Sequence, residues 1–503
     1  MKKINFIILL VVALTHFSCG DFLNESPRHQ WDVDKAMTTY SNAVQSVNGI
    51  YGIFMPGDNF NMALSTSYAN RSGLFDKLRK DNRYEYTQSD SPANYWGTAY
   101  RMINAANLAI NGIPNVPDAA FPTATTKNEL IGEAKLLRGY AYSILLLNYG
   151  LWWDTDDSKY GVVYRDKTAD VANTNQPRIS VGESWKKIFE DIDYAIANMS
   201  DKFNSAKTAS KLFAKAYKAK LLLIRGAERN SADDIKTAKT LIDECISSLP
   251  SDVAVQGSMV EHFAQSWDSK ENIFVRYLED NANRSYNAGY ACCYYLGSNY
   301  FTNFIVDGVE VSQADAVCGL KYGIEWMRED PRWYIATGKA RKPDTWDNTY
   351  AWTWTKIYRK GMYAGKIDPI DEKYAVYLMR VPELYLMQAE LRARTGASLA
   401  ESIAPINMFR AKRTTPKLDK ISTPANAQEF WDILFQEYCK ELIFENGCEY
   451  YASLRINKNG HSYMEEIKGP DFHYDKTKRQ FPIPYVEMIY NQAIAGMQNP
   501  GQD

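Results

Sequence analysis

The chain has no excess of charge of either sign. It carries 58 Lys and Arg residues against 60 Asp and Glu residues over its 503 positions, which gives a formal net charge of −2. A surface that binds nucleic acid or an anionic membrane needs a basic excess. Nucleic acid is therefore not an expected partner of this chain.

Metal-ligand patterns are also missing from the sequence. The histidines beyond the N-terminal segment are scattered along the chain, at His29, His262, His461 and His473. The acidic stretch 154–157 suggests calcium, but an EF-type loop that starts there needs Gly at its sixth position and Glu at its twelfth. Lys159 and Arg165 occupy these positions, so we interpret the stretch as a solvated acidic turn. We expect neither a metal ion nor a cofactor.

Signatures of catalysis are absent as well. The sequence has no Gly-x-Ser-x-Gly elbow, no P-loop and no His-Glu-x-x-His motif. A chain with 60 acidic residues contains many possible pairs of carboxylates for glycoside hydrolysis. Such pairs therefore do not distinguish an enzyme from a binding protein. We expect a protein that is not an enzyme, with a secreted helical glycoside hydrolase as an alternative.

Long hydrophobic runs are confined to the N-terminus. Lys2 and Lys3 precede the apolar stretch 4–14, and Ser18-Cys19 follows where a lipoprotein signal peptidase would cut. No later stretch approaches the roughly 20 apolar residues of a spanning helix. We predict that residues 1–18 are a lipoprotein signal peptide and that Cys19 is lipidated, which anchors the chain to a membrane. An ordinary secretory signal is the alternative.

Cysteine pairs with a recognisable spacing are missing too. Beyond Cys19 the cysteines lie at Cys245, Cys292, Cys293, Cys318, Cys439 and Cys448, without a Cys-x-x-Cys motif. An exported protein can form disulfides. We nevertheless expect most of these thiols to be reduced and buried.

Helix signals, in contrast, are abundant. Four stretches begin with a capping residue followed three positions later by Glu, at 126–129, 180–183, 398–401 and 426–429, and each precedes an amphipathic stripe. Further helices are predicted at 96–111, 208–228, 231–248 and 374–395. The pairs 208–228 with 231–248 and 374–395 with 398–413 fit a repeat of tetratricopeptide (TPR) length. A single helical bundle is the alternative.

The periodicity and composition of the chain change near residue 251 and again near residue 372. Between residues 251 and 372 helical periodicity fades and aromatic residues crowd together, and 350–358 alternates like a strand with one aromatic face. We predict a mainly α fold with a TPR-like helical-pair scaffold and an irregular, loop-rich aromatic subdomain that contains a few short strands. The scaffold comprises 19–250, with an irregular insert at 51–96, and 373–503. The aromatic subdomain at 251–372 is the expected ligand-binding part.

Aromatic and polar side chains are interleaved in two of the irregular stretches. A sugar ring has an apolar face and a belt of hydroxyls, so its site needs flat aromatics together with amides and charged groups. The predicted ligand-binding residues are Arg79, Asn94, Tyr95, Trp96, Trp326, Trp346, Asp347 and Tyr350. For any one of the aromatics, a place in the core of the subdomain is the alternative.

The C-terminal tail has the most specific pattern. Pro482 and Pro484 flank Ile483, fix φ twice and remove two backbone donors, so Phe481–Pro484 must be extended and cannot be a central strand. A short helix can follow, and Asn-Pro-Gly at 499–501 makes a turn. We interpret the tail as a clamp on the helical scaffold and not as a ligand site.

This tail resembles the end of SusD/RagB proteins, which are surface glycan-binding lipoproteins of Bacteroidetes. Further blocks are similar to that family in the same order, at 21–27, 133–142, 148–150, 379–390 and 441–447. The residues at 448–451 and 152–154 depart from its pattern. The resemblance implies a TPR scaffold that docks on a SusC-like TonB-dependent transporter, with helical face 133–149 supporting the docking, and a variable region that binds oligosaccharide.

The resemblance gives the expected function. The chain is interpreted as a surface-exposed lipoprotein of the outer membrane that binds an oligosaccharide and delivers it to such a transporter. A peptide or another nutrient as the ligand, and a structural or adhesive lipoprotein, are the alternatives within the class of non-enzymes.

Overall fold

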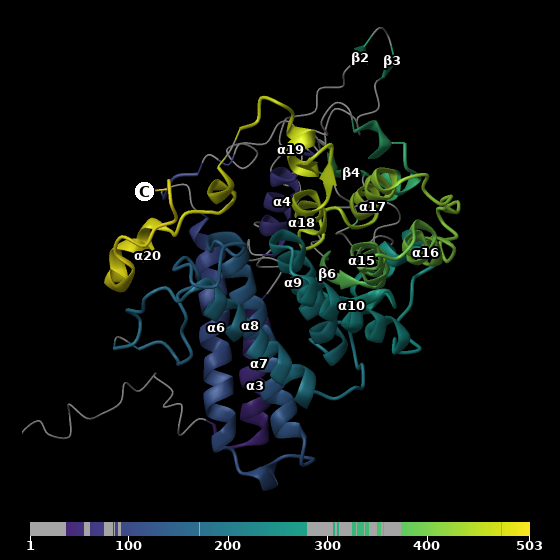
Figure 1. Ribbon diagram of the computed structural model, residues 1–503. Coiled ribbons are helices and arrows are strands. Elements are labelled where there is room, and N and C mark those ends of the chain that lie inside the picture. The colour runs from purple at the N-terminus through teal and green to yellow at the C-terminus, as the bar shows by residue number, and fades with distance from the viewer. Residues whose placement is uncertain are drawn as a thin grey trace, which may run out of the picture.

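The fold is mainly helical, as predicted (Figure 1). The computed structural model describes residues 37–54, 61–74, 84, 86–88, 92–170, 172–278, 305–306, 309–310, 324–327, 329–336, 338–341, 350–353, 356, 374–473 and 475–502. Within these residues, every helix is too short or too polar to traverse a bilayer. The signal segment 1–18 and Cys19 lie outside the described residues.

Four helices form an elongated bundle at the bottom of Figure 1. They are α3 (Tyr40–Ile53), α6 (Ala93–Gly112), α7 (Thr126–Tyr149) and α8 (Val181–Asn198). A side chain at Gly139 of α7 would meet Ile192 and the carbonyl of Ile188, so glycine permits the close approach of α7 and α8. Arg138 of α7 fixes the same contact, because its Nε donates to Asp191 at 2.7 Å.

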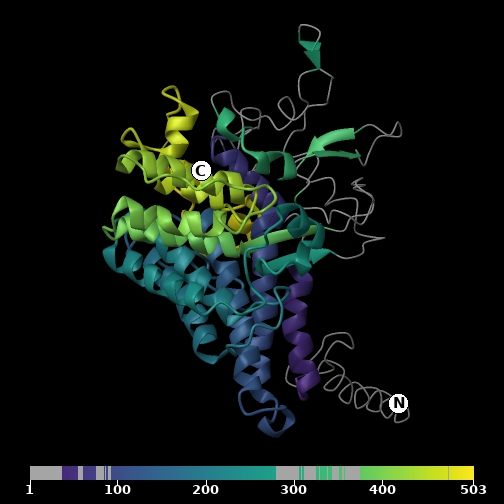
Figure 2. The same cartoon turned by 90° about the vertical axis from the view of Figure 1, so that its right-hand side faces the viewer.

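The second half of the scaffold consists of helix pairs with short connections. α9 (Lys211–Arg229) pairs with α10 (Ala232–Ser247), and α15 (Val381–Arg394) pairs with α16 (Leu399–Arg410). α10 packs on α15, and α17 (Ala427–Leu442) and α18 (Cys448–Arg455) continue the stack. Figure 2 shows these helices as successive layers from teal through green to yellow. The predicted TPR-like pairing is confirmed.

The predicted helix caps are confirmed in part. Ser398 forms the complete capping box with Glu401. Ser180 and Asn426 cap their helices by accepting from the backbone N–H of Glu183 and Glu429. At the fourth stretch the cap position is Thr125 and not Thr126, and its side chain makes no capping bond to the backbone.

One predicted helix begins seven residues too early. Tyr374–Arg380 is strand β6, which pairs antiparallel with β1 (Asn272–Leu278), with Leu278 opposite Tyr374 and Asn272 opposite Arg380. Pro382 explains the error, because a proline inside a helix would leave the carbonyl of Leu378 without its donor. Proline is tolerated in the first turn, where α15 has it.

The other described strands and helices are short. The strands form three two-stranded sheets: β2 (Ile305–Val306) with β3 (Val309–Glu310), β4 (Gly338–Arg341) with β5 (Tyr350–Thr353), and β7 (Asn457–Lys458) with β8 (His461–Ser462). The short helices are α4 (Asn61–Arg71), α11 (Met259–Gln265), α14 (Pro331–Ala336), α19 (Tyr463–Lys468) and α20 (Tyr485–Tyr490).

A buried charge cluster joins the region after β1 to the helical scaffold. The cluster consists of four cations and four carboxylates: Arg332, Lys356, Arg380, Arg413, Glu271, Glu437, Glu441 and Glu445. Arg380 donates through Nε to Glu445 at 2.7 Å and also pairs with Glu271. Burial alone would raise the pKa of Glu441, but the guanidinium groups of Arg413, Arg380 and Arg332 lower it to about 2.

The C-terminal tail is extended and then helical, as its prolines predict. The N–H of Phe481 donates to the carbonyl of Asn148 at 2.8 Å, and the N–H of Ile483 donates to Gln498 Oε1 at 2.8 Å. Asn499 Nδ2 donates to the carbonyl of Tyr149 at 3.0 Å. Arg178 is buried and donates to Asn499 Oδ1 at 2.9 Å. These bonds hold the tail on the end of α7.

The described cysteines agree with the expectation of buried thiols. Cys245, Cys439 and Cys448 are buried and free. Burial raises the pKa of the Cys245 thiol to about 12, which keeps it protonated. Cys292, Cys293 and Cys318 lie outside the described residues.

Candidate functional site

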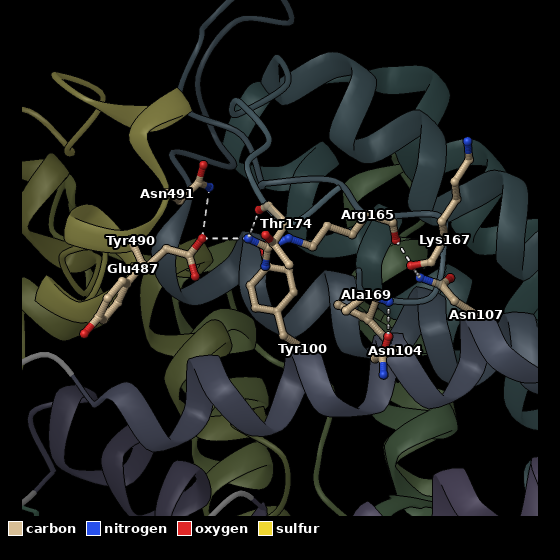
Figure 3. A pocket seen from close by; sticks show the side chains of 11 residues that line it. Tyr100, Asn104, Asn107, Arg165, Lys167, Ala169, Thr174, Glu487, Tyr490 and Asn491 are labelled. Atoms are coloured by element: carbon tan, nitrogen blue, oxygen red, sulfur yellow. Dashed lines mark hydrogen bonds and ion pairs between the residues drawn. The ribbon is translucent and has the colours of Figure 1, made fainter. Parts of the chain in front are cut away.

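A pocket of about 280 Å³ opens between α6, the segment that carries Arg165 to Thr174, and α20 (Figure 3). Its walls come from three parts of the chain that are distant in sequence. They are Tyr100, Ile103, Asn104 and Asn107 of α6, Arg165, Lys167, Ala169 and Thr174 of the following segment, and Glu487, Tyr490 and Asn491 of the tail. The α6 residues recur at helical spacing, so one face of that helix forms the wall.

Arg165 is the centre of the pocket in Figure 3. Its guanidinium carbon lies 4.6 Å from the ring centroid of Tyr100. Its NH2 donates to Glu487 Oε1 at 2.7 Å and to the carbonyl of Thr174 at 2.9 Å. A planar cation that is stacked on a ring and bonded at its edge has little rotational freedom. The pocket therefore presents a preorganised guanidinium.

Glu487 uses both carboxylate oxygens in bonds to neighbouring side chains. Oε1 accepts from Arg165 and also from Asn491 Nδ2 at 3.0 Å. Oε2 accepts from the indole Nε1 of Trp96 at 3.0 Å. A carboxylate that is held in this way fixes its partners and is poorly placed to transfer protons. Its role here is to hold Arg165 and α20 in place.

Amide side chains fix the loop side of the pocket. Asn107 Nδ2 donates to the carbonyls of Arg165 and Lys167, at 2.9 and 3.0 Å. Asn104 Oδ1 accepts from the N–H of Ala169 at 2.7 Å. The segment that carries Arg165 and Lys167 is thus tied to α6 at three points, and its backbone is rigid where it meets the pocket.

Tyr490 gives the pocket an exposed aromatic ring. Its side chain is 80% exposed, although it belongs to a tail that is otherwise tightly bonded. Burial raises the pKa of Tyr100, the second ring of the pocket, so that its phenol stays neutral. The pocket combines flat apolar rings with charged groups and amides, which is the combination that a sugar ring requires.

The predicted residues of α6 lie beside this pocket and not in its wall. Asn94 is exposed in the first turn, and Tyr95 is half-buried against Phe481, with ring centroids 6.1 Å apart. Trp96 is only 6% exposed and packs on Tyr100 and Tyr149. The burial of Trp96 favours the alternative that its ring belongs to the core, and its indole N–H donates to Glu487 of the tail.

The remaining predicted residues belong to the region after β1. Trp326 is half-buried on α17, with its ring 6.3 Å from that of Phe435, and Lys440 Nζ lies 5.5 Å from its centroid. Tyr350 begins β5, but its side chain lies outside the described residues, as do Arg79, Trp346 and Asp347. Their roles as ligand-binding residues stay predictions.

The residues that line the pocket are not among the ligand-binding residues predicted from the sequence, and the structure shows why. Tyr100, Asn104 and Asn107 continue the helical face that begins at Trp96, and this spacing could have pointed to them. Glu487 and Arg165 are 322 positions apart, and no local pattern connects them. The proline pattern of the tail predicts only a clamp, whereas α20 also supplies Glu487 and Tyr490 to the pocket.

Two models of known protein families match this chain, one in each half. A family model described as "Starch-binding associating with outer membrane" matches residues 21–223. A second model, described as "SusD family", matches residues 251–501. The chain is 22% identical to the SusD-like protein P38 of Formosa agariphila, over 98% of this chain and 99% of that protein.

Solved structures share the fold over nearly the whole chain. A SusD superfamily protein from Bacteroides vulgatus superposes with a TM-score of 0.67 at 19% identity, covering 93% of this chain and all of that one. Surface glycan-binding protein A from Bacteroides fluxus gives a TM-score of 0.65 at 15% identity, covering 92% of this chain and all of that one. Both likenesses show a common fold.

Proposed function

Because the chain belongs to the SusD/RagB family, we propose that it is an outer-membrane surface protein that binds an oligosaccharide and delivers it to a SusC-like TonB-dependent transporter. The lipid on Cys19 would hold it at the membrane. One matching family model is described as starch-binding and associated with the outer membrane, and one structural neighbour is named a surface glycan-binding protein. The proposed mechanism is equilibrium binding without chemistry.

The pocket in Figure 3 is the observation that carries this proposal. Tyr490 offers an exposed ring, and Arg165 is held in one orientation by Tyr100 and Glu487. A pyranose could stack its apolar face on the tyrosine while its hydroxyls bond to the fixed guanidinium and to neighbouring amides. Rigid groups lose little entropy on binding, which favours affinity for a small ligand.

A pair of tyrosines on one helix tests the pocket. A glycan array identifies a ligand, and calorimetry then compares the Tyr490→Ala and Tyr485→Ala variants with the parent protein. Both tyrosines of α20 are exposed, but only Tyr490 lines the pocket. We expect Tyr490→Ala to weaken binding about tenfold, as for loss of a stacked ring worth roughly 1 to 2 kcal/mol, and Tyr485→Ala to leave it unchanged.

The same assay includes the predicted residues Trp326 and Trp346. If Trp346→Ala abolishes binding while Tyr490→Ala has no effect, the ligand binds in the aromatic subdomain and the pocket is not its site. If the array finds no glycan, or if the protein releases reducing ends from one, the proposal of a glycan-binding protein without catalysis fails.

A further inference from the structure

A second concave surface lies on the opposite part of the scaffold from the pocket. Two hollows, of about 420 and 980 Å³, both include Ala227 and Asn230 at the end of α9. They are therefore parts of one groove, which runs from Lys476 past Asn230 to Trp431 and is called the α9 groove here. Residues of α9, α10, α15 and α17 line the groove, and Figure 1 shows these helices apart from α6 and α20.

Among the charged residues that line the α9 groove, cations outnumber carboxylates. Lys236, Lys239 and Arg394 line the wider hollow, and no Asp or Glu is among its lining residues. The narrower hollow is lined by Arg455, Lys476 and Arg479, together with Glu228 and Glu465. Six cationic residues against two acidic ones is an excess that contrasts with the net charge of −2 of the whole chain.

Neighbouring carboxylates pair with four of these cations. Glu390, behind the groove, pairs with both Arg394 and Arg455 at 2.9 Å. Glu228 likewise pairs with both Lys476 and Arg479. Each of these carboxylates therefore serves two cations of the groove.

The lysines of α10 complete the charge balance. Lys239 has its own partner, Asp243, at 2.7 Å. Lys236 is exposed, and none of the ion pairs of the described residues includes it. The cations that line the groove outnumber the carboxylates that line it, and the low-dielectric walls of a concavity concentrate such a field.

The groove also carries groups that suit a carbohydrate. Trp431 is half-buried, and the guanidinium of Arg394 lies 5.1 Å from its ring centroid, so an aromatic ring stands beside a cation. Asn230 lies at the junction of the hollows, and Ser231 and Thr240 add hydroxyls. Amides and hydroxyls bond to sugar hydroxyls, and the cations would pair with carboxylate or sulfate groups.

We propose that the α9 groove binds an acidic polysaccharide, a chain whose sugars carry carboxylate or sulfate groups. This inference rests on the proposed function in that the occupant is a carbohydrate. It adds a second binding surface, selective for charge, to the pocket between α6 and α20.

Polygalacturonate and its methyl ester are the probes, because they share one backbone and differ in charge. Calorimetry at low ionic strength measures the binding of both polymers to the parent protein and to a double variant, Lys236→Glu with Lys239→Gln. The control is Lys417→Glu with Lys420→Gln, which makes the same change of charge at exposed lysines that do not line the groove. Trp431→Ala is measured alongside.

We expect polygalacturonate to bind and its methyl ester not to bind. The groove variant and Trp431→Ala should each weaken binding at least tenfold, the control variant should not, and added salt should weaken binding of the parent protein. Equal binding of the two polymers, or equal weakening by groove and control variants, would overturn the inference. So would binding of polyglutamate in place of polygalacturonate, because the groove would then accept acidic peptides.

The pocket variant separates this inference from the proposed function. Tyr490→Ala should keep its affinity for polygalacturonate. If the groove variants change nothing while Tyr490→Ala loses a neutral glycan, the α9 groove is not a binding site but the proposed function stands. If no polymer binds and no neutral glycan binds, both proposals fail.

Discussion

The protein uses arginine–carboxylate pairs in two regions with opposite consequences. In the buried charge cluster, Arg332, Arg380 and Arg413 are completely inaccessible to solvent, and each pairs with carboxylates of at least two residues. In the pocket, Arg165 pairs with one carboxylate among the described residues, that of Glu487, and the side chains of the two are 17% and 14% exposed.

The difference shows what burial does to the same chemical group. A buried ion pair stabilises a fold only while all of its members are present, because a charge that loses its partner cannot be solvated. A pair at the wall of a pocket can reach solvent or a ligand when it opens. The cluster therefore holds the sheet β1–β6 on the helices, and the pocket pair is free to serve binding.

Removing a charge from the cluster should have the largest effect on stability. Arg380→Met leaves Glu271, Glu441 and Glu445 with fewer cations, and we expect unfolding by denaturant to report a loss of about 3 to 5 kcal/mol. The control is Lys186→Met, whose side chain is 60% exposed and whose pair with Glu183 spans 3.4 Å; its loss should stay below about 1 kcal/mol. Equal losses for the two variants would contradict the distinction between the regions.

Glu449 extends the comparison because it is a buried carboxyl that forms no ion pair with any residue that the structure describes. Its Oε1 accepts from the N–H of Phe444 at 3.2 Å, and its Oε2 has no hydrogen-bond partner among the described residues. Burial raises its pKa to about 8, whereas the arginines lower that of Glu441 to about 2. The two carboxyls lie on neighbouring helices of one scaffold, so the difference comes from their partners.

The raised pKa of Glu449 predicts a pH dependence of stability. A carboxyl whose pKa is higher in the folded state stabilises the fold below its unfolded pKa of 4.5, and this contribution is lost as the pH rises to about 8. Glu449→Gln removes the titration. The variant should gain roughly 2 to 3 kcal/mol relative to the parent protein between pH 6 and pH 8. A constant difference across that interval would show that Glu449 is ionised in the folded protein.

Local signals and distant contacts differ in how well the sequence predicts them. Ser398 and Glu401 lie three residues apart, and their capping box formed as expected. Phe481–Pro484 is extended because proline restricts its own backbone. The sequence wrongly predicts a helix over residues 374–380, because their pairing with β1, across about a hundred positions, cannot be inferred from either segment alone.

The candidate site shows the same limit. Trp96 has the residue type of a sugar platform, and only the return of the tail over α6 turns it into a buried positioning residue. The sequence predicts that Tyr490 belongs to a structural tail, and only its 80% exposure in the pocket that Arg165 also lines identifies it as a candidate for binding. Burial and exposure depend on which segments meet, so residue type could suggest the chemistry but not the residues.

Breaking the Arg165–Glu487 pair of the pocket should have the smallest effect on stability and a clear effect on ligand binding. Glu487→Gln keeps the shape of the side chain and removes the charge that holds Arg165, so we expect less than about 1 kcal/mol of lost stability, as for a pair near solvent. Affinity for the glycan found by the array should fall several-fold, because a guanidinium without its partner loses its fixed orientation.

Glu190→Gln provides the matched control for this prediction. Glu190 pairs with Lys187 at 3.1 Å on the surface of α8, its side chain is 49% exposed, and it does not line the pocket. Its substitution makes the same change of charge and should leave affinity unchanged. If Glu487→Gln costs as much stability as Arg380→Met, the pocket pair is structural in the same sense as the buried charge cluster. Unchanged affinity with unchanged stability would show instead that the orientation of Arg165 plays no part in binding.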